Sequence, residues 1–273
     1  MHSGFFNQLL LISQFELKRF FATRKGLLSL LTFAVVWYVI LRYPLRFAAD
    51  MLIKGQGFIE GSSFFDFIGL SSLHHWAIPE FAVYWHFALF IFPMLSINLA
   101  ADQSCSDRER GTLRFIALRS SRDSIFFGRF LGVMLIQMLL ISMTALATLA
   151  LVVYRDATLF SAALANLLAI VVNVALAILP FTAMMAVLSA KVKSVRQATL
   201  WAILIWTFLA AIISGLAHYL PVLDFFKCLI PGYQIADLTK LSEWKTLQLA
   251  YIPILQALVL LGLGRWLMVR QTL

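Results

Sequence analysis

Charged residues are scarce in this chain of 273 residues, and the shortage decides its class. Only 13% of the residues are charged, whereas 62% are hydrophobic. A soluble domain normally carries about a quarter charged residues. So few charges cannot cover a folded surface of this size, and a large part of the chain must therefore face lipid. The composition excludes an ordinary soluble enzyme or binding domain.

Motifs for nucleotide and metal binding are also lacking. No Gly-x-x-x-x-Gly-Lys-Ser/Thr occurs, so we expect no ATP-binding loop on this chain. His74, His75 and His86 are not accompanied by a His-Glu-x-x-His or Cys-x-x-Cys motif, and we expect no metal and no cofactor here. The two cysteines, Cys105 and Cys228, are expected on opposite sides of the membrane and thus unpaired.

Long apolar runs are abundant instead, and they are continuous rather than alternating with period two. This pattern favours helices over a barrel. A span needs roughly 20 mostly apolar residues. We expect spans at about 26–41, 80–101, 125–153, 159–189, 198–218 and 250–268. The third and fourth are long enough to tilt or to project from the hydrocarbon. The sequence predicts an all-α membrane protein with one six-span domain over residues 26–273.

The basic residues predict the orientation of these spans. With the N-terminus inside, 15 of the 22 basic residues flank spans on the cytoplasmic side, as the positive-inside rule requires. We therefore expect a multi-pass protein of a bacterial inner membrane, with both termini cytoplasmic. A net charge of +9 also occurs in nucleic-acid-binding proteins. Because the charges flank spans here, no nucleic-acid binding is expected.

Residues 1–25, before the first span, have the periodicity of an amphipathic helix. At 100° per residue, one stripe is apolar and the opposite one is polar. The apolar stripe comprises Phe5, Leu9, Ile12 and Phe20, and the polar stripe comprises Asn7, Gln14, Lys18 and Lys25. The pattern predicts an interfacial helix on the cytoplasmic surface of the membrane.

Glu16 falls in the middle of the apolar stripe of this helix. A carboxylate there is costly unless it is paired. Our hypothesis is that Glu16 meets an arginine of the next cytoplasmic loop, such as Arg108 or Arg110. The alternative, that the helix is rotated or frayed and Glu16 is solvated, stays open.

The loop at 102–124 packs charges densely before a Gly-Thr pair and a short apolar stretch. Ser120, Ser121 and Asp123 supply turn and N-cap chemistry before the third span. A short helix parallel to the membrane, charged on one side and apolar on the other, suits docking to a soluble partner. The alternative is a loop that only sets topology.

Three segments resemble the permeases of the ABC type-2 exporter family. They are Glu16-Leu-Lys-Arg19, Asp107-Arg-Glu-Arg-Gly-Thr-Leu-Arg114 and Gly128-Arg-Phe-Leu-Gly132. The six-span layout agrees too, so the resemblance covers nearly the whole chain, with its specific part at about 102–132. It implies that Glu16, Lys18 and Arg19 belong to a connecting helix. It also implies that a coupling helix sits in a groove of an ATPase and includes Asp107, Arg108, Glu109, Arg110, Gly111, Thr112, Leu113 and Arg114.

The resemblance further implies an exporter, and the absence of charged residues within the spans favours an amphiphilic or apolar substrate that leaves outward. Two copies of a separate ATPase would hold ATP and magnesium, and a second permease copy or a paralogue would complete the pathway. The alternatives are a stand-alone secondary transporter or channel, or an intramembrane enzyme. Both would need ionisable groups at mid-membrane, whereas the spans offer Asn98, Gln137, Asn166 and Asn173.

The loops expected on the outer side are 42–79 and 219–249. The second is broken by Pro221 and by Pro231-Gly232, yet it is too apolar for a solvated loop. We expect outer-leaflet re-entrant helices there, before the last span. By resemblance, this hairpin gates the exit and the loop at 42–79 packs on it.

Overall fold

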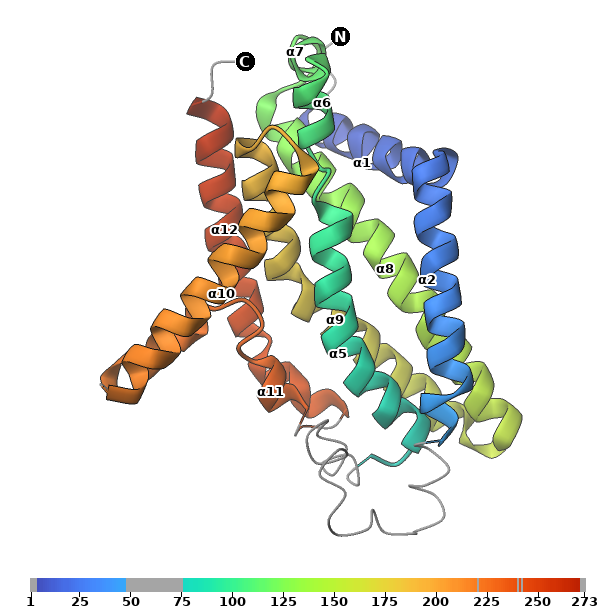
Figure 1. The fold of residues 1–273 in the computed structure, drawn as a ribbon. Coiled ribbons are helices and arrows are strands. Elements are labelled where there is room, and N and C mark those ends of the chain that lie inside the picture. The colour runs from blue at the N-terminus through green and yellow to red at the C-terminus, as the bar shows by residue number, and fades with distance from the viewer. Residues whose placement is uncertain (1–3, 48–75, 220, 240, 242, 271–273) are drawn as a thin grey trace.

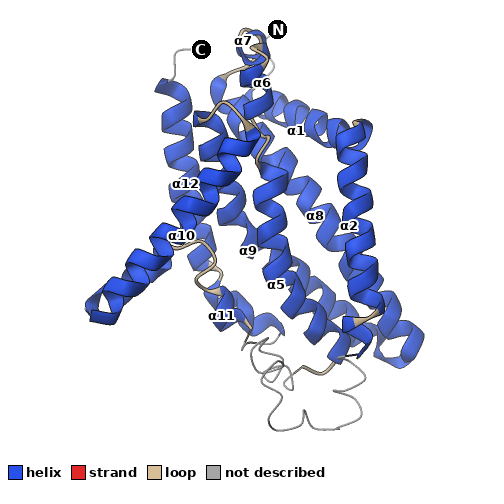
Figure 2. Cartoon of the chain, viewed as in Figure 1, coloured by secondary structure: helices blue, strands red, loops and turns tan. Residues whose placement is uncertain are grey.

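The computed structural model describes residues 4–47, 76–219, 221–239, 241 and 243–270. Within these ranges the chain forms helices and turns and no strand (Figures 1 and 2). Among the described residues, six helices belong to segments long and apolar enough to cross a membrane. They are α2 (Arg24–Arg42), α5 (Pro79–Ala100), α8 (Arg122–Arg155), α9 (Phe160–Lys191), α10 (Val195–Tyr219) and α12 (Tyr251–Arg270). The prediction of an all-α membrane protein with six spans is confirmed.

The predicted spans match these helices closely, and the differences are at their ends. The first apolar helical segment runs over Gly26–Phe47 and thus extends past the predicted 26–41. α8 and α9 have 34 and 32 residues, as expected from their long apolar runs. At 1.5 Å per residue each is roughly 50 Å long. Both helices exceed a hydrocarbon core of about 30 Å.

The helices α5, α8 and α9 form the centre of the bundle, and α2 and α10 lie at its edge. About half of the apolar window is buried in each central helix, compared with about a tenth in α2 and α10. Figure 1 shows α10 diverging from α9 and α12 toward its C-terminal end. Long faces of α2 and α10 are therefore left for lipid or for a partner.

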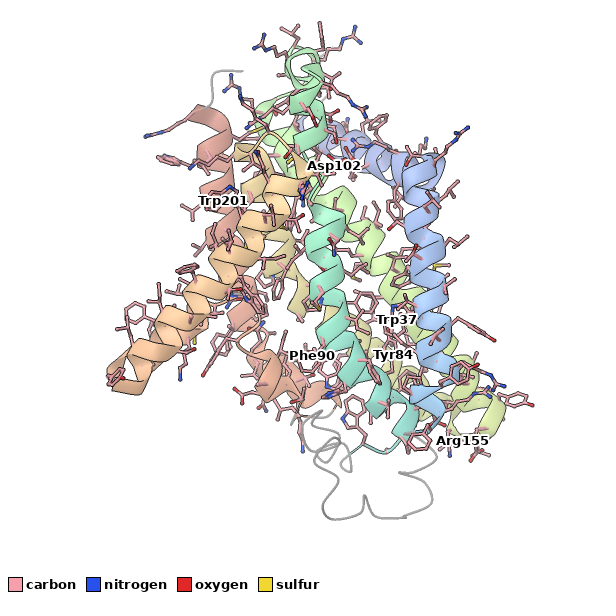
Figure 3. The ribbon with its side chains drawn as sticks, in the orientation of Figure 1. Trp37, Tyr84, Phe90, Asp102, Arg155 and Trp201 are labelled. Atoms are coloured by element: carbon pink, nitrogen blue, oxygen red, sulfur yellow. The ribbon has the colours of Figure 1, made fainter. Side chains whose placement is uncertain are left out.

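Aromatic side chains attach α2 to α5. The Trp37 ring stacks on Phe92 and lies against Tyr84, with 5.4 Å between ring centroids in each pair (Figure 3). Phe33 contacts Phe92 at 6.1 Å. These contacts lie in the half of α2 farther from its start at Arg24, and they bury Trp37 almost completely.

The first helix, α1 (Phe5–Ala22), lies across the end of the bundle at which α2 begins (Figure 1). The tight elbow between these helices needs a glycine. A Cβ atom on Gly26 would lie 1.7 Å from the carbonyl oxygen of Phe20. The last residues of α12 lie at this same end, which we call the α1 end of the bundle.

Short helices connect α10 to α12 at the opposite end: η3 (Pro221–Leu229), α11 (Ile235–Leu238) and η4 (Glu243–Leu249). Side chains of the spans hold this segment. Gln256 Nε2 donates to the carbonyls of Cys228 and Ile230 at 2.6 and 3.0 Å, and Trp206 Nε1 donates to that of Pro231 at 2.8 Å. Re-entry of these helices into the membrane stays a prediction. Most of the expected loop at 42–79, with His74 and His75, lies outside the described residues.

Candidate functional site

The predicted coupling helix lies at the α1 end, and it is two helices rather than one. They are α6 (Cys105–Glu109) and α7 (Thr112–Ala117), which project from the bundle between α5 and α8 (Figure 1). Gly111 separates them with φ 71°, in the left-handed region that favours glycine. No heavy atom lies within 4 Å of a Cβ built there, so the requirement is conformational rather than steric.

Some residues of the predicted coupling set, Thr112 and Leu113 among them, make contacts within the chain. Thr112 Oγ1 donates to Asp107 Oδ1 at 3.0 Å and closes the break between α6 and α7. Leu113 is buried in an apolar cluster with Ala186, Ala190 and Met268, among others. Its side chain therefore anchors α7 to the bundle, and the membership of Leu113 in an ATPase-coupling helix stays a prediction.

The exposed residues of these helices form one projecting surface. We call it the α6–α7 tip; it comprises Glu109, Arg110, Arg114, Phe115, Leu118 and Arg119. Phe115 and Leu118 are 71% and 83% exposed. Large apolar side chains this exposed and rimmed by arginines indicate a docking surface. The motif did not include Phe115, Leu118 or Arg119, although the apolar stretch that contains the first two was a visible signal.

Beneath the tip lies a group of charges that we call the inner charge cluster: Glu16, Arg19, Asp102, Asp107 and Arg129. Its centre is Arg129 on α8, which is only 3% exposed. Its guanidinium donates to the Gln103 carbonyl at 2.6 Å and to the Asp107 carboxylate. Its Nε lies 3.8 Å from Glu16 Oε1. Arg129 thus joins α1, α6 and α8.

The other basic member of the inner charge cluster, Arg19, is shared among the three carboxylates. Its nitrogens lie 3.4 Å from Glu16 Oε1, 3.4 Å from Asp102 Oδ2 and 3.7 Å from Asp107 Oδ2. All three distances exceed the 2.7–2.9 Å typical of a charge-assisted hydrogen bond. Arg19 therefore neutralises no single carboxylate fully.

The structure corrects the hypothesis about Glu16 in one respect. Glu16 is buried and paired, as proposed, which excludes the solvated alternative. Its partners are Arg19 and Arg129, however, rather than Arg108 or Arg110. The sequence pattern does not single out Arg129 as a partner of Glu16, because the two residues are distant in sequence.

Replacement of Glu16 by glutamine is expected to raise stability relative to the wild type as the pH rises. Burial raises the pKa of Glu16 above its ordinary value of 4.5, against the opposing effect of Arg19 and Arg129. The folded state therefore favours the protonated acid, so the wild type loses stability as the pH increases above 4.5 through the raised pKa. Glutamine carries no such dependence.

The measurement is the difference in thermal unfolding midpoint between Glu16→Gln and wild type from pH 4 to pH 8, in detergent. The two unfolding midpoints should be equal near pH 4, and the midpoint of Glu16→Gln should rise above that of the wild type toward pH 8. A difference that moves in favour of the wild type with rising pH would contradict the raised pKa.

Two glycines seat α1 against α8. A Cβ on Gly128 would lie 2.9 Å from Ile12 Cβ, and one on Gly132 would lie 2.8 Å from Glu16 Cβ. Such separations are below normal carbon contacts, so only glycine permits this approach. The small-residue pair serves packing within the chain, and it holds Glu16 beside Arg129 on the next turn of α8.

A cavity of about 490 Å³ lies between α5, α9 and α10, beside the second half of α5 and the first half of α10. Its walls are mostly apolar and include Phe90, Phe181 and Trp206, with Asn98 and Thr199 as polar members. Gly232, at φ 86°, begins the segment that closes it. Volumes of 300–1,000 Å³ are usual for small-molecule sites.

The family of the chain can be named from a sequence comparison. A model described as "ABC-2 family transporter protein" matches residues 10–267. The chain belongs to this family. It is therefore the membrane permease of an ABC transporter, a transport component rather than an enzyme by itself, and association with an ABC ATPase follows. No curated protein sequence matches it. The matched range includes the inner charge cluster and the α6–α7 tip of the permease.

Proposed function

We propose that the permease is one half of an ATP-driven exporter, with two copies of a separate ATPase that hold ATP and magnesium. A second copy of the permease, or a paralogue, completes the pathway. The α6–α7 tip faces the bacterial cytoplasm, with both termini, and each tip docks into a groove of one ATPase. This orientation is supported by the excess of basic residues flanking the spans at the α1 end.

The observation that carries this proposal is the form of the α6–α7 tip. It projects from the bundle, and it combines exposed apolar side chains with three arginines, Arg110, Arg114 and Arg119. This combination complements a partner groove with an apolar floor and an acidic rim.

The contacts behind the tip suit the transmission of force. Leu113 anchors α7 in the bundle, and Asp107 ties α6 to Arg129 on α8. Because Gly132 seats α1 on α8, a push on the tip would move α1 and α8 as one rigid unit. Motion of a half-buried central helix would then reach the outer end of the bundle.

The cavity beside α10 supports the expected substrate class. Aromatic and aliphatic side chains form most of its wall, and its few polar groups are uncharged. Such a lining favours an apolar or amphiphilic molecule over an ion. We propose that the substrate occupies this cavity on its way outward.

Docking through the tip is tested with the double variant Phe115→Asp/Leu118→Asp. Both side chains are exposed, so the permease should still fold, but two carboxylates would have to enter an apolar groove. We expect the amount of ATPase that copurifies with the permease to fall at least about tenfold, since each unpaired buried charge costs more than the 1.4 kcal/mol that tenfold requires.

The matched control is Lys193→Asp, which changes an exposed residue of the α9–α10 turn at the same end. It should retain the ATPase. Copurification of the ATPase with the tip variant at the wild-type level would overturn the proposed docking surface.

A further inference from the structure

A second cavity, also of about 490 Å³, lies at the α1 end between the α1–α2 elbow, α5 and α8. We call it the inner cavity. Residues of α1 and of the start of α2 line one side of it, and residues of α5 and α8 line the other. Phe33 and Trp37 attach α2 to α5 from the middle of α2 onward. In the first turn of α2, Gly26 is buried against Phe20 of α1.

The lining of the inner cavity is divided between two kinds of side chain. Apolar groups from three helices form one part, namely Phe20, Leu99, Val133 and Ile136. Charged groups form the other part, namely Glu16, Arg19, Asp102, Asp107 and Arg110. Figure 3 places Asp102 at the end of α5, on the side where α1 crosses the bundle. A cavity with a charged wall and an apolar wall at one end of a membrane bundle matches an amphiphile.

Three carboxylates of this wall, Glu16, Asp102 and Asp107, share two arginines, Arg19 and Arg129. Asp107 is satisfied by Arg129, which lies behind it and is almost completely buried. Glu16 and Asp102 share Arg19 at 3.4 Å each. Glu16 also lies 3.8 Å from Arg129, and Asp102 Oδ1 accepts from the Ser106 backbone N–H at 3.0 Å. Asp102 is the more accessible of the two, with 39% of its side chain exposed. A cationic group would therefore find acceptors at Asp102 and Glu16.

Arg110 adds the opposite charge at the rim of the same cavity, where it is exposed. An arginine fork suits a phosphate. We propose that the inner cavity binds an amphiphile from the adjacent leaflet whose head group carries a primary ammonium and a phosphate. The ammonium lies against Asp102 and Glu16, the phosphate meets Arg110, and the tails follow Leu99, Val133 and Ile136. The inner cavity and the cavity beside α10 share only Asn98 among the residues that line them, and lipid binding in the inner cavity requires neither ATPase nor export.

The test is native mass spectrometry of the purified full-length permease in detergent, titrated with dioleoyl phosphatidylethanolamine. Dioleoyl phosphatidylglycerol has the same tails and phosphate but no ammonium. We expect the permease to bind phosphatidylethanolamine about tenfold more tightly, because hydrogen bonds between charged groups are among the strongest in proteins. Equal affinity for the two lipids would overturn the proposal.

Variants locate the site. Asp102→Asn should abolish the preference for phosphatidylethanolamine, and Val133→Trp should weaken the binding of both lipids by filling the apolar part. The matched controls are Asp123→Asn, whose carboxylate pairs with Arg265 outside the cavity, and Leu31→Trp on the exposed face of α2. Both controls should bind as the wild type does. An unchanged preference in Asp102→Asn would place the lipid elsewhere and refute the assignment.

Reconstitution with the ATPase distinguishes a lipid that is transported from a lipid that stays bound at the elbow. ATP-dependent movement of labelled phosphatidylethanolamine to the opposite leaflet would identify the bound lipid as cargo. Retention in its own leaflet would identify it as a resident lipid of the elbow. Either result supports the head-group site. In the first case Asp102→Asn should abolish the ATP-dependent movement, and in the second it should abolish the selective binding of phosphatidylethanolamine.

Discussion

Replacement of Arg129 by methionine is expected to destabilise the permease by about 3 to 5 kcal/mol, the usual cost of removing one partner from a buried ion pair. Methionine fills much of the same volume, so the loss is mainly electrostatic. The Asp107 carboxylate would lose its tightest partner, and Glu16 would keep only Arg19 at 3.4 Å. The Gln103 carbonyl would also lose its donor. The measurement is the thermal unfolding of the purified permease in detergent.

The matched control is Arg265→Met. Arg265 pairs with Asp123 at 2.8 Å, but its side chain is 58% exposed. Exposed pairs contribute about 0 to 1 kcal/mol, so this variant should unfold near the wild-type temperature. Arg129→Lys should fall between the two, because an ammonium keeps the charge but not the planar fork that reaches Gln103 and Asp107 together. Equal losses of stability in the variants at positions 129 and 265 would show that burial does not strengthen the ion pairs of the inner charge cluster.

The spans could be predicted from the sequence because the cost of leaving apolar residues in water depends on composition alone. Which of these spans lie at the centre of the bundle could not be predicted. α5 and α10 are both continuous apolar helices, yet about half of one window and a tenth of the other is buried. Lipid tails are as apolar as leucine, so hydropathy does not separate a helix that faces lipid from one that faces protein. Only the structure shows which helices pack against α5.

The candidate site shows the same division. The motif located the projecting segment, and its glycine, Gly111, lies in the left-handed region of backbone conformation. The motif could not show that Leu113 is buried, because Ala186 and Met268, which cover it, are distant in sequence. Arg129 was missed for a similar reason. A basic residue near the start of a span looks like a topology signal until Asp107 and Gln103 fold over it.

Replacement of Gly132 by leucine is expected to dislodge α1 from α8 and to destabilise the permease by about 3 kcal/mol, the upper part of the usual range for overpacking. The first added carbon would already lie 2.8 Å from Glu16 Cβ and 3.1 Å from the Ser13 carbonyl oxygen. The carbonyl belongs to the α1 backbone and cannot move without the helix. Displacement of α1 would also take Glu16 and Arg19 away from Arg129 and Asp107.

The chain offers a close control in Gly262→Leu. Gly262 lies in α12, and no heavy atom lies within 4 Å of a Cβ built there. Leucine at this position should leave stability unchanged or raise it slightly, because glycine is about 1 kcal/mol worse than alanine in a helix. Two measurements separate the variants, namely the thermal unfolding midpoint and the rate of trypsin cleavage after the exposed Lys18 of α1. Faster cleavage in Gly132→Leu alone is the expected result. If both variants were cleaved at the wild-type rate, the position of α1 would not depend on Gly132. Under the proposed function, a push on the α6–α7 tip would then reach α8 through α6 and α7 alone.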